Sequence, residues 1–272
     1  MINRREEIKK KGFSINNLKE NPEVDFSKIK VGIKNLDDAI LTTGELKRIN
    51  PELAKKENVL NAIQNGEYNK MREISNFFYK TSGIYSRLCR YMAYLYRYDW
   101  AVTPYINSKS VSTDKILSGF YKVLNYLEDF GVKKFFGEVA LKVIRNGCYY
   151  GYLIRQNDRA VVQELPPEYC RSRYSVGGRP AVEFNMKYFD AAFKDANYRI
   201  RILNLFPAEF KKGYILYKEG KLPQDDAGGD RGWYLLDPKN TIKFNINGED
   251  YPAFISVIPA IIDLDSAQDL DR

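Results

Sequence analysis

The spacing of the apolar residues along this chain changes at Gly147. Before that glycine, apolar side chains recur every three or four positions, which is typical of amphipathic helices. After it, apolar and polar residues alternate in short runs separated by turn-forming pairs, which is typical of antiparallel strands. We therefore expect an α+β fold in which long amphipathic helices pack on a small unit rich in β-hairpins.

Four helices are expected before Gly147, and a short strand is expected after the second. Glycine can end the last two, because it adopts the left-handed conformation at a helix C-terminus at little cost. The expected elements are helices at 67–80, 84–99, 113–130 and 132–146, with Thr113 capping the third and Gly131 and Gly147 as stops, and a strand at 101–106. The apolar face of the third helix is expected to comprise Ile116, Leu117, Phe120, Val123, Leu124 and Leu127. The buried side of the fourth is expected to comprise Phe135, Phe136, Val139, Ala140 and Val143.

Two β-hairpins are expected after Gly147. Asn157-Asp158 can form the turn of the first and Gly177-Gly178 the turn of the second, because these residues tolerate positive φ angles. Pro166-Pro167 breaks the pairing between them. The expected elements are strands at 149–156, 159–165, 170–176, 180–187, 214–217, 233–236 and 241–245, helices at 207–212 and from about 253, and a loop at 224–232.

The chain divides into four expected segments. Residues 1–66 form an arm that we expect to be partly ordered, with plain disorder as the alternative. Residues 67–147 form the helical part and residues 148–252 the β-rich part. The last segment, 253–272, has no residue that stops a helix at its end, so we interpret it as the start of an interrupted helix.

The composition argues against most catalytic chemistry. The chain has no histidine, which removes the commonest general base, the commonest zinc ligand and every nucleophile that depends on histidine. Cys89, Cys148 and Cys170 show no CxxC spacing and are expected to be reduced thiols in a cytoplasmic setting. The longest apolar run, 253–262, is too short to span a bilayer, and the first residues do not resemble a signal peptide. We expect a protein that is not an enzyme and has no membrane span.

No metal or cofactor site is expected either. Acidic residues gather at two places, but in a Gly-rich loop and a calcium-loop-like segment without the required ligands they are expected to be solvated. No Gly-rich phosphate-binding motif is present. A metal-dependent enzyme is therefore the least favoured hypothesis. The two acidic groups are Asp225, Asp226 and Asp230, and Asp263, Asp265, Asp269 and Asp271.

The second helix carries the best candidate for a contact site. The chain has a formal charge of +8 and 21 tyrosines, which favours a polyanionic neighbour and much contact surface, although an AT-rich genome would also enrich tyrosine. A basic stripe on one arc of this helix could bind phosphates and stack on a base, or it could be a solvent-facing or intersubunit face. The stripe consists of Arg87, Arg90, Tyr94 and Arg97. A separate arc carries Ile84, Leu88, Tyr91, Met92 and Leu95.

Three stretches, taken in order, resemble the wing region of tailed-bacteriophage portal proteins. Residues 69–106 contain the helix pair that leads into a strand with a tryptophan before it. Residues 143–186 contain the run NGCYYGYLI, a hairpin, the run LPPEYCRS and a glycine turn. Residues 233–271 resemble the segment before the family's stem helix. The shared order carries the resemblance, because each motif alone is loose.

The resemblance implies a fold, a function and partners. The fold would be the portal wing, and the stem, clip and crown would lie beyond Arg272. The function would be that of a subunit in a dodecameric ring at one capsid vertex, where double-stranded DNA is packaged and ejected. Its partners would be other copies of itself, terminase, capsid and scaffold proteins, tail adaptor proteins and the DNA. Its location would be the virion, after assembly in the host cytoplasm. No binding residue of the family carries over. The alternative function is a non-enzymatic nucleic-acid-binding protein that uses the basic stripe.

Overall fold

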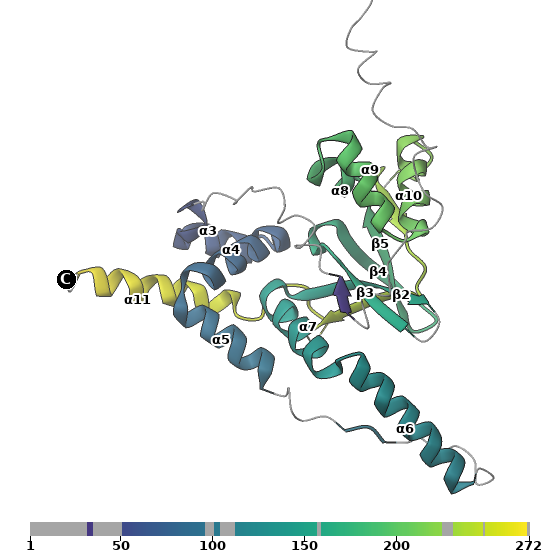
Figure 1. The fold of residues 1–272 in the computed structure, drawn as a ribbon. Helices are drawn as coiled ribbons and strands as arrows, with labels where there is room; N and C mark the ends of the chain where they lie inside the picture. Colours follow the sequence, from purple (N-terminus) through teal and green to yellow (C-terminus); the bar gives the residue numbers. More distant parts are fainter. Residues whose placement is uncertain are drawn as a thin grey trace, which may run out of the picture.

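The fold of the chain is α+β and combines two small sheets with a group of helices that packs beside them (Figure 1). In this computed structural model, the described residues are 32–34, 51–95, 101–103, 112–156, 159–224, 231–246 and 248–270. Most of the expected arm lies outside these residues, although its last part contains the 3₁₀ helix η3 (Pro51–Ala54) and helix α3 (Lys56–Gln64). Of the expected strand at 101–106, residues 101–103 have no regular structure, and the rest lies outside the described part.

Helices α4 (Tyr68–Thr81) and α5 (Gly83–Tyr94) confirm the expected helix pair and the break between its members. Ser82 ends the first helix in an extended conformation, and its side chain accepts a hydrogen bond from the backbone N–H of Tyr85. Such a cap satisfies one of the backbone donors that the start of a helix leaves without an internal partner. The two helices therefore separate at this serine.

The buried face of α5 differs from both arcs seen in the sequence. Tyr85, Cys89 and Ala93 are buried, at a spacing of four residues, against α4 and α7. These small or polar-tipped residues stand out poorly as a core face on a helical wheel. The more apolar arc of α5 instead contains exposed side chains.

Helices α6 (Thr113–Asp129) and α7 (Val132–Asn146) also lie where they were expected. Ser112, and not Thr113, is the residue before the first turn of α6, and its side chain makes no capping hydrogen bond. Gly131 and Gly147 both have positive φ angles, of 63° and 82°. Both glycines therefore act as the expected stops.

The first sheet has four strands in the order β1-β3-β2-β7. Strands β2 (Cys148–Gln156) and β3 (Arg159–Leu165) pair antiparallel and confirm the first hairpin. Strand β7 (Thr241–Asn245) pairs antiparallel with β2, and the short β1 (Gly32–Lys34) pairs parallel with β3.

The second sheet has three antiparallel strands in the order β4-β5-β6. Strands β4 (Cys170–Val176) and β5 (Arg179–Asn185) confirm the second hairpin, and β6 (Trp233–Leu235) confirms the next strand. Gly177 and Gly178 have φ angles of 57° and 76°, as a type I′ turn requires at its two central positions.

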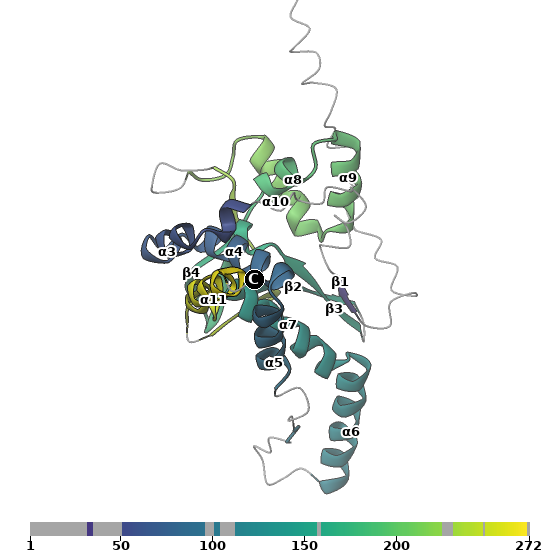
Figure 2. The same ribbon diagram turned by 90° about the vertical axis from the view of Figure 1, so that its left-hand side faces the viewer.

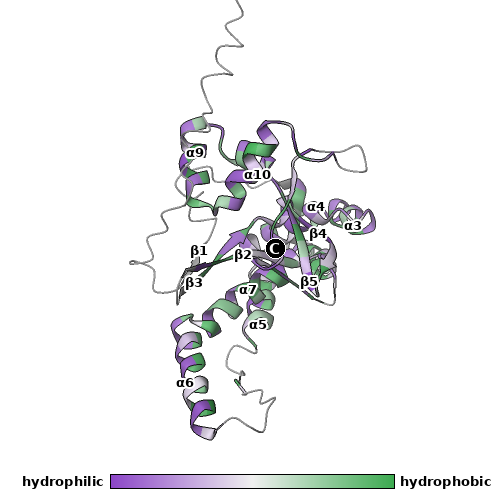
Figure 3. Ribbon diagram, turned by 90° about the vertical axis from the view of Figure 1, so that its right-hand side faces the viewer, coloured by the Kyte–Doolittle hydropathy of each residue, from purple (hydrophilic) through white to green (hydrophobic). Residues whose placement is uncertain are grey.

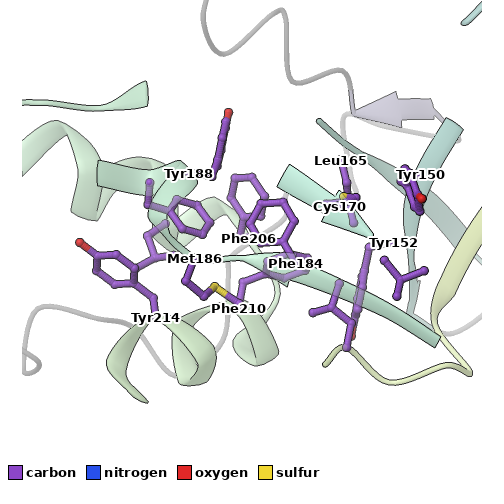
Figure 4. Close-up of a cluster of buried hydrophobic side chains, with 14 of the residues drawn as sticks. Tyr150, Tyr152, Leu165, Cys170, Phe184, Met186, Tyr188, Phe206, Phe210 and Tyr214 are labelled. Carbon is purple, nitrogen blue, oxygen red and sulfur yellow. The ribbon is translucent and has the colours of Figure 1, made fainter. Parts of the chain in front are cut away.

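The two faces of the first sheet bury different cores, because successive side chains of a strand point to opposite sides. On one face, Tyr149 and Val162 pack against α7. On the other, Tyr150 and Tyr152 join a large aromatic cluster with β5 and the helices that follow it (Figure 4). The ring of Phe210 lies 5.2 Å from that of Tyr152, in an edge-to-face arrangement that aromatic pairs prefer.

Three helices lie in the β-rich segment, where the sequence predicted one helix at 207–212, which the last of the three confirms. They are α8 (Lys187–Ala192), α9 (Ala196–Leu205) and α10 (Ala208–Lys218). The strand expected at 214–217 is wrong, because these residues continue α10. Phe210 and Tyr214, four residues apart, place one face of that helix in the aromatic cluster, and this packing prevails over the β propensity of the local sequence.

The chain ends its described part with the 3₁₀ helix η5 (Ile255–Val257) and α11 (Ile258–Leu270). Ile258 and Ile261 are buried against the helical core, and α11 then extends away from the sheets (Figures 1 and 2). Within the described part of the chain, no helix is both long enough and apolar enough to cross a bilayer.

Arg72 of α4 links the helices to the first sheet. It is only 6% exposed, and its guanidinium donates to the carbonyl oxygens of Asn146 (2.9 Å) and Asp250 (3.0 Å). It also contacts Sγ of Cys148 at 3.3 Å. Asn146 comes just before the turn between α7 and β2, Cys148 comes just after it, and Asp250 belongs to the segment packed against it. This one side chain therefore fixes the position of that turn.

Gly147 lies in that turn under two constraints. Its φ angle is positive, and a Cβ atom at this position would lie 2.2 Å from the carbonyl carbon of Tyr251. Gly131 shares the positive φ angle, but a Cβ atom there would meet nothing within 4 Å. A comparison of substitutions at the two glycines therefore separates the energetic effect of the backbone conformation from that of the close contact with Tyr251.

We predict that Gly147→Ala destabilises the protein far more than Gly131→Ala. The left-handed conformation costs an alanine about 1–2 kcal/mol at either site. At residue 147, displacing the Tyr251 backbone adds about 1–3 kcal/mol or more. Urea unfolding followed by circular dichroism measures both values. Equal losses of stability would show that the contact with Tyr251 is unimportant.

Candidate functional site

Helix α6 presents an apolar face that the described part of the chain covers only in part: Leu117 and Val123 are exposed, and the other residues of this face are half-buried. None of its 17 residues is buried, although it is strongly amphipathic. The helix stands away from the two sheets in all three ribbon views, and Figure 3 shows apolar segments along it. The expected helix is thus confirmed, but its apolar face is not part of the core. That face consists of Ile116, Leu117, Phe120, Val123, Leu124 and Leu127.

The elbow between α6 and α7 is a packed structure. The ring of Phe130 lies 5.1 Å from that of Phe135, and Phe130 packs on the core beneath α7. The N–H of Gly131 donates to the carbonyl of Glu128, and the N–H of Phe135 donates to the carbonyl of Gly131. These contacts hold α6 in its outward direction.

The outer side of α7 forms the wall of an apolar groove. Phe136 was expected on the buried side of this helix, which is wrong: its side chain is 51% exposed, whereas that of Phe135 is 6% exposed. The ring of Phe136 lies 6.2 Å from the ring of Phe244, which is part of β7. Together with Val143 and Ile246 these residues line a groove of about 250 Å³.

The apolar arc of α5 is also exposed. Ile84, Tyr91, Met92 and Leu95 all face outward, and the Tyr91 side chain is 66% exposed. Exposed apolar residues scattered singly are normal on a protein surface. Here more than half of the exposed large apolar residues of the described chain lie on α5, α6 and the α7–β7 groove, and these are the candidate interaction surfaces.

The structure divides the basic stripe of α5. Arg87 is exposed. Arg90 is exposed too, but its Nε donates to the hydroxyl of Tyr79 at 3.0 Å. Tyr94 is partly buried and packs so closely on α7 that a Cβ atom at Gly137 would lie 3.1 Å from its ring. Arg97 lies outside the described residues. Arg90 and Tyr94 are thus already engaged within the chain.

The acidic groups fall in different places. Asp225, Asp226, Asp230 and Asp271 lie outside the described residues, whereas Asp263, Asp265 and Asp269 lie on α11. Asp263 forms an ion pair with Lys56 of α3 at 2.6 Å. Among the described residues, no three cysteine or acidic side chains come together as a metal site would require.

The three thiols are buried in the core. Burial raises the pKa of Cys89 and of Cys148 to about 11, and it raises the pKa of Cys170 well above its ordinary value. A reactive cysteine needs the opposite shift, which a neighbouring cation or a helix N-terminus provides. At neutral pH these side chains are therefore protonated and serve as small apolar groups.

Comparison with known proteins gives no match: no family model, no curated protein and no solved structure is similar to this chain.

Sequence reasoning did not find the groove. Its two walls come from residues about a hundred positions apart, Phe136 and Phe244, and only the pairing of β2 with β7 brings them together. One signal was present: Phe135 and Phe136 are adjacent on a helix, and adjacent side chains point about 100° apart. They cannot both face the centre of one core.

We predict that the thiols react only when the protein unfolds. At pH 8 the folded chain should leave Ellman's reagent uncoloured, and urea should release three thiols per chain. The pKa values of the three thiols are higher in the folded chain than in the unfolded chain. The contribution of these thiols to stability is therefore complete below about pH 8.5. It declines as the pH rises toward 11. Rapid labelling of the native protein would contradict the buried positions.

Proposed function

We propose that this chain is the wing part of a phage portal subunit. Such subunits form a ring at one capsid vertex, through which double-stranded DNA is packaged and ejected, and which terminase, scaffold and tail adaptor proteins contact. The order of elements supports this: a helix pair, two successive hairpins and a final helix occur in the order that the resemblance implies. The proposed role is structural, and no catalytic residue is part of it.

The apolar faces of α5 and α6, which the described chain leaves exposed or only half-buried, are the observation on which the proposal depends most. An amphipathic helix is stabilised in proteins mainly by burying its apolar face. Within the described chain, α6 buries none of its residues. A ring repeats a head-to-tail contact between two different surfaces until the rotation closes. A protein of this kind needs apolar surfaces that only a neighbouring copy covers.

The direction of α11 agrees with the proposal. Its first turn is anchored in the helical core through Ile258 and Ile261, while Lys56 holds Asp263 one turn further along. Leu264 is exposed, and the helix leaves the body in Figure 1 and points toward the viewer in Figure 2. In a portal subunit, a helix at this point would lead from the wing toward the stem.

We predict closed rings with a central channel for the product of the whole reading frame. Negative-stain imaging of that product beside the 272-residue chain would show them, and sedimentation velocity would give their mass. A product that remains monomeric across a range of salt and protein concentrations would contradict the proposal.

The alternative, nucleic-acid binding in a monomer, retains support from the exposed Arg87 and the net charge of +8. Arg90 and Tyr94, the middle residues of the stripe, are engaged within the chain, so the stripe presents no continuous basic face. We therefore predict that Arg87→Ala with Arg97→Ala changes neither DNA affinity nor its salt dependence. A DNA-binding stripe would behave otherwise, since losing two phosphate contacts reduces the slope of log K against log salt by about 2. Fluorescence anisotropy at several salt concentrations distinguishes the two, with Lys80→Ala plus Lys122→Ala as a control of equal charge.

A further inference from the structure

We propose that the apolar face of α6 of one copy docks into the α7–β7 groove of a neighbouring copy. This inference rests on the proposed function, and it assigns the two surfaces of the head-to-tail contact. One surface is convex, the helix face centred on Phe120 and Leu124. The other is concave, the groove lined by Phe136, Val143, Phe244 and Ile246. A heterologous contact requires two different and complementary surfaces on the same chain, which these are.

The size of the groove suits side chains of α6. An engineered cavity of about 150 Å³ holds a benzene ring. At about 250 Å³, the groove therefore has room for the ring of Phe120 and an aliphatic neighbour such as Leu124. The groove walls are apolar throughout, and the exposed rings of Phe136 and Phe244 stand at its edge. Recognition of an amphipathic helix by a hydrophobic groove is a common mode of protein binding.

A chain cannot fill its own groove with its own α6 in this conformation. Phe120 lies 11 residues before the elbow at Gly131, about 16 Å along the helix axis. Phe136 lies five residues after it, about 8 Å in the other direction along the chain. The packed rings of Phe130 and Phe135 hold the elbow, so the apolar face of α6 stays away from the groove of its own chain. Only a second copy can bring the two surfaces together.

The charges beside the two surfaces are complementary. Helix α6 has one more acidic than basic residue, and α7 has three more basic than acidic residues. Glu128 lies one turn after Leu124 on the same side of α6, and Lys133 lies one turn before Phe136 on the same side of α7. Opposite charges at the rim of an apolar contact help to set its register and its partner.

The expected strength of one junction favours a ring. A single helix face is smaller than the area of about 800 Å² that each partner contributes to a standard interface. A dimer held by one such junction would be weak. Each copy in a closed ring makes two junctions, one with each surface, so closure stabilises what a single contact cannot.

Disulfide trapping between two singly substituted proteins tests the proposal. One protein carries Leu124→Cys and the other Ile246→Cys, and the native cysteines are buried and should not interfere. After mild oxidation, we expect a crosslinked dimer only when both proteins are present. The matched control replaces Leu124→Cys with Asn125→Cys, which places the thiol one residue away on the polar side of α6 and should give no crosslink.

Sedimentation of two aspartate variants provides the second measurement. Leu124→Asp should weaken association at least tenfold, whereas Asn125→Asp, with the same new side chain at the next position, should leave it unchanged. Both should fold, because neither residue is buried in the single chain. Equal association of the two variants would overturn the proposal.

The outcomes separate this inference from the proposed function. Rings without the mixed crosslink would overturn the assigned contact and leave the portal proposal standing. A dimer from Leu124→Cys alone would mean that two α6 helices pair symmetrically, which also overturns it. A third protein carries both substitutions in one chain. A disulfide within that chain would mean that α6 folds back onto its own groove, which also overturns the proposal. A protein that never associates would overturn both proposals.

Discussion

The junction between the helices and the first sheet depends on the buried guanidinium of Arg72. Burying such a group is costly unless each of its donors finds a partner. Its donors reach Asn69 within α4, the end of α7 and the backbone of Asp250, so the cost is offset only when these three segments are correctly placed. The Asp250 carboxylate, in turn, accepts from Lys243 at 2.8 Å and from Asn245 at 2.9 Å, both on β7. One polar network thus joins the helices to the edge of the first sheet.

This network determines which surfaces remain for other molecules. It holds the turn at Gly147 against Tyr251, and the N–H of Ala253 then donates to the carbonyl of Ile144. Helix α7 is consequently fixed with its Phe135 side on the sheet and its Phe136 side beside β7. The groove therefore results from the junction, since a shifted α7 would separate Phe136 from Phe244. Because a packed elbow joins α6 to the start of α7, the direction of the apolar face of α6 depends on the same junction.

Much of the fold could be predicted from sequence, because the strongest signals were local. Gly147 ends a helix because its φ angle is positive, and Gly177-Gly178 form a hairpin turn for the same reason. The failures involve tertiary contacts. The residues 214–217 favour a strand in isolation, but Phe210 and Tyr214 pack as one helix face in the aromatic cluster. On α5, helical spacing identified an apolar arc, but could not show that Tyr85, Cys89 and Ala93 are the residues that face α4 and α7. For the candidate site, the sequence identified the apolar face of α6 but not the groove, whose walls are distant in the chain.

The exposure of α6 has a consequence for its stability. Isolated helices shorter than about 12–15 residues are marginal in water, and most helices in proteins persist because tertiary packing buries one face. Helix α6 has 17 residues and buries none of them, so in a single chain it is held mainly by its own hydrogen bonds and by the elbow at Phe130. A contact that covers Phe120 and Leu124 would supply the missing burial. Ordering of this helix and association of the chain would then be one coupled equilibrium, in which any surface that stabilises α6 is also the surface that joins the copies.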